Sequence, residues 1–381
     1  MHRQTRRGFM ARTLGAAWAG ASTFERAVLV AARARAQSKA PAPVLFDLQK
    51  VASGIYAAIA HGRAIINSNA AIFENANDVL IVDAHGAPAA VYSLVAQIRR
   101  EVTSKPVRYV VATHMHGDHT QGLPAYRRVA PGADIISSSK TRELLSEVGV
   151  SRLRAAKESA ARSIETLSRR ASAASNAEEK AWVEEMLAQT RAFVEEMRDV
   201  EVELPNVTFG DRLVLHDKAH DLHLAWHGRG HTAGDIVVHC PQKRVIASGD
   251  LVHGFFPTIG DGYPRDWPNT LRSLSELEFQ NVIGGHGGVQ PTAQRLGQLR
   301  ASLEDLDEVV SNAKRSGTPV ERLQELVTPA SLKSLAGGYG EYLTGEVKRH
   351  DFRVRLLTDA EVMARGVRDN VAAVYRNINR T

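Results

Sequence analysis

The chain has 381 residues, of which 44% are hydrophobic and 24% charged, a balance typical of a globular protein with enough apolar side chains for a full core. Its formal net charge is +6 at pH 7, but residues 1–36 contain seven arginines and one glutamate, which account for the whole excess. Because the remainder is close to neutral, we expect no nucleic-acid partner.

An arginine pair marks the first segment of the chain. Arg6-Arg7 precedes a weakly apolar, alanine-rich stretch, and Ala34-Arg35-Ala36 has the small-x-small form of a cleavage site. Residues 1–36 therefore resemble a bacterial twin-arginine signal peptide, which implies the twin-arginine export machinery as a partner and a periplasmic or secreted location. A disordered basic tail is the alternative. No stable membrane anchor is expected, because charged residues interrupt the apolar run at Glu25, Arg26 and Arg33.

The first half of the mature chain alternates between strand and helix patterns. After a proline-containing linker at 40–43, we predict a strand over Val51–Ala60 that is broken in its middle by a serine and a glycine. Ala70–Glu74 and Asp78–Val82 are predicted to form a hairpin, because a polar turn joins them. His85 follows on a Gly/Pro loop and is expected to be solvated.

A helix between two strands comes next. Pro88–Val102 has apolar residues at the helical period, and Val107–Ala112 and Ala133–Ser138 return to strand patterns. This order predicts an α/β arrangement in which the chemistry lies where strands end.

Residues 140–200 are rich in charge and carry no strand signal. Apolar residues recur there at helical spacing, namely Trp182, Met186, Phe193, Met197 and Val200. We predict a helical insertion folded back on itself. It would either cover the mouth of a cleft or pair with another subunit, and the sequence leaves the oligomeric state open.

Short strands resume in the second half of the chain. They are predicted at Val207–Leu215, Leu222–Trp226, Ile236–Cys240, Val245–Ala247 and Val282–Ile283. Cys240, the single cysteine, excludes an intramolecular disulfide and is expected to be a small buried hydrophobe, with a catalytic thiol as the alternative. Beyond these strands, leucines at spacings of three and four predict a helical extension over residues 291–381.

One loop concentrates side chains that bind metals. Four such residues follow the strand at Val107–Ala112, namely His114, His116, Asp118 and His119. Further donors follow later strands in short glycine-containing motifs, namely His231 in Gly230-His231-Thr232, Asp250 in Ser248-Gly249-Asp250 and His286 in Gly284-Gly285-His286. All these donors are nitrogen or oxygen, and a site without thiolates is more typical of catalytic than of structural zinc.

The order and spacing of these motifs resemble the metallo-β-lactamase superfamily over about residues 44 to 290. The resemblance implies an α/β fold, a four-layered αββα sandwich over residues 41–290, with the helical insertion at 140–200 and the extension at 291–381 packed on the same domain.

The resemblance also implies a ligand set for two metal ions. Of the donors above, one ion would be held by His114, His116 and His231. The other would be held by Asp118, His119 and His286, with Asp250 bridging the two. Asp83 would tie the sheet edge to the metal loop. We expect two Zn²⁺ ions, although iron or manganese also suits such ligands.

The bridging aspartate bears on the reaction. Asp250 resembles the ligand of glyoxalase II and lactonase types, whereas the clinical dinuclear β-lactamases have cysteine or serine there. The resemblance therefore implies an exported hydrolase in which a metal-bridging hydroxide attacks an ester, lactone, thioester or amide carbonyl of a small-molecule substrate. Asp118 would be catalytic, orienting the nucleophile and moving its proton.

Other reactions stay open within this resemblance. A β-lactamase or a phosphate- or sulfate-ester hydrolase would use the same hydroxide. An iron-dependent oxidoreductase of the same fold is a further alternative, but flavin-linked iron members have glutamate where this chain has His116. A non-catalytic binding protein is disfavoured because all seven ligand positions hold competent residues.

The remaining polar and aromatic residues near these motifs have weaker patterns. His253 is expected either to donate to the substrate or to hydrogen-bond within its loop, and Tyr263 is the predicted substrate contact on an aromatic Gly/Pro loop. Phe255 and Trp267 belong to the same loop and either line the pocket or pack on helices. The other histidines are expected in a loop or a solvated turn, namely His227, His216, His220 and His223.

Overall fold

The computed structural model describes residues 44–65, 67–291 and 293–380. The signal peptide predicted at residues 1–36 and the linker at 40–43 lie outside the described residues. Leu45–Thr381 forms one compact unit, which contains both sheets and all the helices described below. Among the described helices, none combines the length and the apolar character needed to cross a lipid bilayer.

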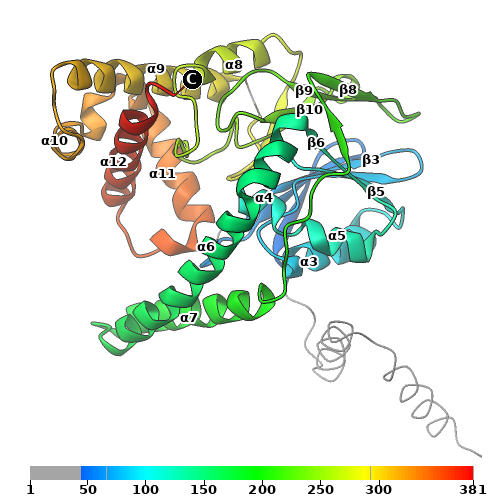
Figure 1. Cartoon of the computed structure of the whole chain (residues 1–381), viewed down its shortest axis with the longest axis horizontal. Helices are drawn as coiled ribbons and strands as arrows, with labels where there is room; N and C mark the ends of the chain where they lie inside the picture. The colour runs from blue at the N-terminus through cyan, green and yellow to red at the C-terminus, as the bar shows by residue number, and fades with distance from the viewer. Residues whose placement is uncertain (1–43, 66, 292, 381) are drawn as a thin grey trace, which may run out of the picture. The chain divides into compact units, whose positions relative to one another are not determined.

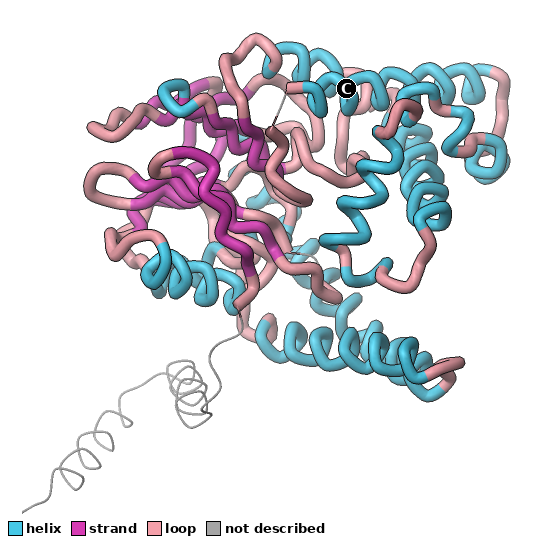
Figure 2. The backbone as a smooth tube through the Cα atoms, turned by 180° about the vertical axis from the view of Figure 1, so that it is seen from behind, coloured by secondary structure: helices cyan, strands magenta, loops and turns pink. Residues whose placement is uncertain are grey.

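Two β-sheets lie face to face with helices on both outer sides, so the predicted four-layered α/β sandwich is confirmed (Figures 1 and 2). The first sheet contains, in spatial order, β1 (Phe46–Ala52), β2 (Ile55–Ala60), β3 (Ala70–Glu74), β4 (Val79–Val82), β5 (Val107–Val111), β6 (Asp134–Ser138) and β7 (Val207–Phe209). The second contains β12 (Asn281–Gly284), β11 (Val245–Gly249), β10 (Ile236–Cys240), β9 (Leu222–Trp226) and β8 (Arg212–Leu215).

Strand direction decides where the chain can gather polar side chains. β4, β5, β6 and β7 run parallel, as do β11 and β12. Because the carboxyl ends of parallel strands lie at one edge of a sheet, the loops after them meet at that edge.

The inner faces of the two sheets form a common apolar core. Strand alternation supplies it: in β10, Ile236, Val238 and Cys240 face the other sheet, whereas Val237 faces the outer helices. Cys240 is fully buried there, which confirms the expected small hydrophobe, and burial raises the pKa of its thiol.

Helices cover the outer faces of the sheets. α3 (Pro88–Glu101) and α5 (Leu123–Val129) pack on the first sheet. The second is covered by α8 (Trp267–Leu274), α9 (Gln294–Arg315), α10 (Val320–Leu326), α11 (Tyr339–His350) and α12 (Asp359–Asn377). Short 3-10 helices complete the chain at η1 (Pro241–Lys243), η2 (Pro329–Ser331), η3 (Lys333–Leu335) and η4 (Phe352–Val354). The helical C-terminal extension is therefore part of the outer layer.

The helical insertion consists of α6 (Ser139–Ser172) and α7 (Ala177–Glu196), which lie side by side in Figure 1. The side chain of Ser138 accepts from the backbone N–H of Thr141 at the start of α6. The Trp182 indole on α7 donates to the carbonyl of Phe352 at 3.0 Å, so the insertion also contacts the C-terminal extension.

Two strand predictions were wrong in detail. The run predicted as one broken strand, Val51–Ala60, is a hairpin of β1 and β2, because Gly54 adopts a positive φ of 74° and reverses the chain. The run Val207–Leu215 contributes β7 to the first sheet and β8 to the second, so the chain crosses between the sheets after Phe209.

Candidate metal centre

The loops that follow four strands bring seven histidine and aspartate side chains together. His114, His116 and the short helix α4 (Gly117–Thr120) follow β5. The other donors follow β9, β11 and β12 at His231, Asp250 and His286, respectively. Three overlapping groups of these side chains have ligand atoms within 4.8 Å of one another and could hold a metal ion.

Three histidines form the first group. Nδ1 of His116 lies 3.2 Å from Nε2 of His114 and 2.7 Å from Nε2 of His231. His114 and His231 are almost fully buried. Three ring nitrogens therefore converge on one point at the edge of the sheets.

Two carboxylates and two histidines complete the cluster. Oδ2 of Asp118 lies 3.1 Å from Nε2 of His286 and 3.6 Å from Nε2 of His119. Asp250 reaches His119 through Oδ1 at 3.4 Å, and it reaches both His231 and His286 through Oδ2 at 3.5 Å. Asp250 thus lies between the first group and the second.

Asp83, at the end of β4, orients two of the histidines. It accepts from Nδ1 of His119 at 2.8 Å and from the Thr113 hydroxyl at 2.9 Å. Because that hydroxyl proton is directed to Asp83, the Thr113 oxygen accepts from Nδ1 of His114 at 3.0 Å. Both histidines are thereby turned with Nε2 toward the cluster.

The other two members of the first group are held in the same way. Nδ1 of His231 donates to the Thr258 carbonyl at 2.8 Å, and Nε2 of His116 donates to Asp261 at 2.9 Å. Asp261 also accepts two hydrogen bonds of 2.8 Å from Arg152, a residue of α6. Asp261 therefore links the insertion to a ligand of the candidate centre.

The hydrogen-bond pattern fits a bound cation. In His114, His116 and His231 the proton lies on the nitrogen facing away, so the three converging nitrogens present lone pairs. Lone pairs at 2.7–3.2 Å repel one another unless a cation or an added proton lies between them. His119 Nε2 and Asp250 Oδ1 are also buried with no hydrogen-bond partner among the described residues.

The electrostatics of the cluster point the same way. Burial lowers the pKa of His231 to about 3 and that of His114 well below its ordinary value. Burial alone would also lower the pKa of His286, but the Asp250 and Asp118 carboxylates raise it to about 9. Burial opposes the ionised form of Asp250, yet His286 and His119 hold its pKa well below the usual range. The carboxylates therefore draw positive charge into the cluster, which a metal cation would supply.

The loop that carries His286 passes close to the side chain of Asp250. A Cβ added at Gly285 would lie 2.1 Å from Oδ1 of Asp250, so no larger residue fits without displacing that carboxylate. Asn69 fastens the same loop, because its side-chain amide donates to the carbonyls of Gly284 and Gly287 at 3.0 and 2.8 Å.

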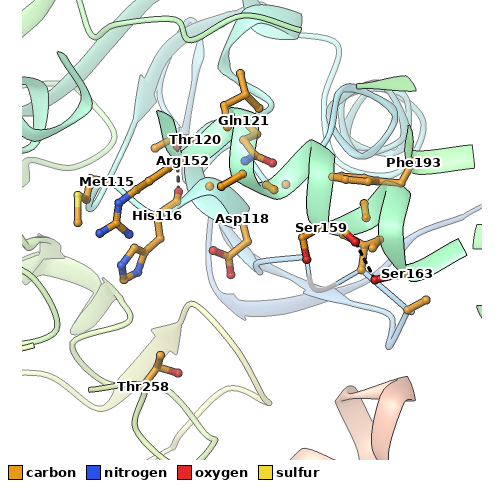
Figure 3. A pocket seen from close by; sticks show the side chains of 18 of the residues that line it. Met115, His116, Asp118, Thr120, Gln121, Arg152, Ser159, Ser163, Phe193 and Thr258 are labelled. Carbon is orange, nitrogen blue, oxygen red and sulfur yellow. Dashed lines mark hydrogen bonds between the residues drawn. The ribbon is translucent and has the colours of Figure 1, made fainter. Parts of the chain in front are cut away.

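A cavity of about 1050 Å³ opens in front of the cluster, and α6 forms one of its walls. His116 and Asp118 point into the space that Arg152 and Ser159 border (Figure 3). Phe255 lines it too, with its ring stacked on His286 at 5.5 Å between centroids, so this aromatic residue belongs to the pocket wall. Trp267 is instead fully buried and donates to the Leu251 carbonyl.

His253 lies beside the cluster and lines the cavity. Its ring centroid lies 6.4 Å from that of His231 and 6.0 Å from that of His286. The backbone N–H of Phe255 donates to its Nδ1 at 3.2 Å, which places the proton on Nε2. That nitrogen is buried and has no hydrogen-bond partner among the described residues. Burial lowers the pKa of His253 to about 4, so the ring is neutral near pH 7.

Tyr263 lies beside two arginines. Its ring lies between the guanidinium groups of Arg229 and Arg380, each 4.7 Å from the ring centroid. Tyr263 is not among the residues that line the described cavity, and the substrate contact expected from the sequence stays a prediction. Its backbone N–H donates to the Gly230 carbonyl at 2.8 Å, and the residue is buried at 8% exposure.

Three other histidines also differ from the sequence prediction. His85 is fully buried rather than solvated, with a positive φ of 65° and Nδ1 bonded to the Ser68 carbonyl at 2.9 Å. His220 is buried and His223 lies in β9, so of the three histidines expected in a solvated turn only His216 is exposed. His227 contacts Ser273, away from the cluster.

Sequence reasoning missed the residues that orient the candidate ligands. Asp261, Arg152 and Thr258 carry no spacing signal, because each contacts a histidine or its partner across a long stretch of chain. The only hint was local: Asp261 and Thr258 lie in the Gly/Pro loop after Asp250 that was expected to form a pocket wall.

Comparison with known proteins identifies similar sequences and folds. The family model described as "Metallo-beta-lactamase superfamily" matches residues 65–286, which is more than half of the chain. A metallo-beta-lactamase from Pontibacter korlensis is similar in structure, with a TM-score of 0.50 and 18% sequence identity over 68% of this chain and 99% of that one. The DIM-1 metallo-beta-lactamase has a TM-score of 0.49 and 19% identity over 68% of this chain and 97% of its own. At such identities the structural likeness bears on the fold alone.

Proposed function

The chain belongs to the metallo-beta-lactamase superfamily, and on that premise we propose that it is an exported, dinuclear zinc-dependent hydrolase. Its substrate is a small molecule with an ester, lactone, thioester or amide carbonyl. The observation that carries the proposal is the convergence of three histidine lone pairs beside the carboxylates of Asp118 and Asp250, with every donor nitrogen or oxygen. Such a donor set suits a catalytic rather than a structural zinc site.

The ligand assignment follows from the three groups of converging side chains. His114, His116 and His231 would hold one ion, and Asp118, His119 and His286 the other. Asp250 would bridge them, since its oxygens lie 3.4–3.5 Å from histidines of both sets. When bound, the two ions would polarise the carbonyl and supply a hydroxide nucleophile near neutral pH.

The protein's own residues would then position the reacting groups. The Asp118 side chain is 27% exposed, against 6% for Asp250, so its carboxylate can reach a molecule in the cavity. Asp118 would accept the proton of the nucleophile and hold it in line with the carbonyl. The buried His253 would donate its Nε2 proton in a hydrogen bond to a substrate oxygen, because this N–H has no partner among the described residues.

Export rests on the leader. Arg6-Arg7 and the alanine-rich stretch up to Ala36 support delivery through the twin-arginine route to the periplasm or beyond. That route carries folded proteins, which suits a chain that acquires its metal before it leaves the cytoplasm. Fractionation of cells that express the full chain, with Arg6-Arg7 replaced by two lysines as the comparison, tests this part separately.

Two measurements on the purified protein test the reaction. Elemental analysis should give two zinc ions per chain, and iron without zinc would instead favour an oxidoreductase. The second measurement uses a panel of chromogenic esters, lactones, thioesters, a cephalosporin and bis-nitrophenyl phosphate. We expect the protein to hydrolyse acyl substrates of this panel. Hydrolysis of the phosphate alone, or full activity after metal removal, would overturn the proposal.

A further inference from the structure

The cavity in front of the metal cluster extends well beyond the space that the proposed reaction needs. Besides the candidate ligands, its lining includes residues from six turns of α6, from Leu145 to Leu167, and residues of α7. In the view of Figure 3, Asp118 lies between His116 on one side and Ser159 and Ser163 on the other. The cavity therefore continues along the insertion, away from the cluster.

Residues on one face of α6 line this extension at helical spacing. They include Arg152, Ala155, Ala156, Ser159 and Ser163, in which Ala155 and Ala156 are adjacent and the other steps are three or four positions. At 1.5 Å per residue, Arg152 and Ser163 are separated by about 17 Å along the helix axis. Because the side chains beyond Arg152 are small, α6 leaves an elongated space rather than filling it.

Two hydroxyl groups of the lining donate within their own helices. The Ser163 hydroxyl donates to the Ser159 carbonyl at 2.8 Å, and the Thr190 hydroxyl on α7 donates to the Met186 carbonyl at 2.8 Å. Their hydrogen-bonding capacity is thus used within their own helices. Ala160, Leu167 and other apolar side chains contribute most of the remaining surface, namely Ile65, Leu153, Met186 and Phe193.

The charged side chains at the two ends are already paired. Near the cluster, Arg152 is held by both oxygens of Asp261 at 2.8 Å. At the other end, Arg353 contacts Asp351 through two hydrogen bonds of 2.8 and 2.9 Å. The lining also includes Arg162, which pairs with Glu158 at 3.6 Å, and Glu203, which pairs with Arg127 at 2.9 Å. These arginines are therefore not placed as free anion receptors inside the groove, and the mainly apolar surface between them is best matched by an apolar chain.

We propose that the α6 groove, lined by Ala155, Ala156, Ser159 and Ser163, binds an extended acyl or alkyl chain attached to the bond that the metal centre hydrolyses. The substrate class is thus an amphiphilic ester, thioester, lactone or amide with a long unbranched tail. This inference rests on the proposed function for its reacting end, and on the groove alone for its tail.

A series of 4-nitrophenyl esters from acetate to dodecanoate, each below its micelle concentration, tests the chain-length preference. Burial of each methylene should raise kcat/KM by up to about fourfold until the groove is filled. A flat or falling profile would overturn the inference, yet it would leave the hydrolase proposal intact because the esters would still be cleaved.

A pair of variants on α6 assigns the preference to the groove. Ser159→Phe places a ring in the groove, so the ratio of kcat/KM for decanoate over acetate should fall by about tenfold or more. Ala161→Phe adds the same ring at an exposed position two residues on, which points about 200° away around the helix, and should keep the ratio within about twofold. Equal ratios in the two variants would contradict the groove assignment. Circular dichroism melts of both variants verify that they are folded.

Direct binding separates failure of the inference from failure of the proposed function. Octan-1-ol carries no hydrolysable bond and should bind the wild-type protein and the Ala161→Phe variant more tightly than Ser159→Phe in titration calorimetry. Binding of octan-1-ol in a protein that cleaves no ester would overturn the hydrolase proposal but support the groove. No difference between the variants, or no binding to the wild type, would overturn the groove.

Discussion

Asp261 accepts two hydrogen bonds of 2.8 Å from the guanidinium of Arg152 and thereby joins the inserted helix α6 to the loop after Asp250. The same carboxylate accepts from Nε2 of His116 at 2.9 Å. The His116 hydrogen bond is the main cause that holds the pKa of Asp261 well below its usual range, and Arg152 adds to it. Because the pair is partly exposed, its contribution to stability is small, and its main effect is to fix the orientation of the His116 ring.

Replacing Asp261 by asparagine should weaken metal binding without unfolding the protein. The amide is a poorer acceptor for the His116 ring, so the affinity for zinc should fall by about 10- to 100-fold in a chelator competition assay. Asp266→Asn is the matched control, because it breaks a 2.7 Å ion pair with Arg229 in the same loop but away from the cluster. Equal zinc affinity in the two variants would show that Asp261 does not position His116.

Removing a candidate ligand should lower bound metal and turnover together. His116→Ala and Asp250→Ala each delete a donor, so the zinc content should drop and kcat should fall by more than about 100-fold, beyond the usual effect of outer partners. His216→Ala serves as the control because this histidine is exposed and its ring bonds to Asp221 at 3.0 Å, in the turn between β8 and β9. A variant that lost metal but kept full activity would contradict the metal-dependent reaction.

A methyl group added at Gly285 should disrupt the candidate metal centre by steric clash. Its Cβ would lie 2.1 Å from Oδ1 of Asp250 and 2.7 Å from Cε1 of His119, so Gly285→Ala should reduce the zinc content and kcat. The control is Gly297→Ala in α9, where a Cβ meets nothing within 4 Å. That variant should retain full zinc and gain about 0.4–1 kcal/mol in the free energy of unfolding. Full zinc occupancy in Gly285→Ala would refute the tight fit.

His253→Phe should retain zinc but slow the reaction. The phenyl ring preserves the bulk and removes the Nε2 donor, so kcat should fall by about 10²-fold, the usual effect of losing one transition-state donor. His253→Gln restores an N–H and should recover part of the loss. If His253→Phe kept the wild-type kcat, the residue would be a packing group of its loop.

His85 should make folding sensitive to acid. Burial lowers its pKa from 6.5 to about 3, so below pH 6.5 the unfolded chain binds a proton that the folded chain excludes. Stability is therefore lost as the pH falls from 6.5 toward 3, by about 2 kcal/mol at pH 5. His85→Asn tolerates the positive φ of 65° and cannot titrate, so urea unfolding of the variant should show a smaller loss between pH 7 and 5. Parallel losses in both proteins would contradict this origin.

Much of the fold and of the candidate site follows from local patterns. The spacing of His114, His116, Asp118 and His119 puts four donors on one loop whatever the rest of the chain does. Period-2 and period-3.6 patterns likewise predicted most of the strands and the helical insertion, because they reflect burial of one face of each element.

The tertiary structure alone decided which distant side chains orient the cluster and that the insertion lines the cavity. Arg152 and Asp261 are 109 residues apart, and no local preference brings them together. The burial of His85, the contact of Tyr263 with Arg229 and the separation of β7 from β8 likewise depend on how the elements pack. The period of the apolar residues shows which face of a helix or strand is buried. Which residues that face contacts is set by the packing of elements that are remote in sequence.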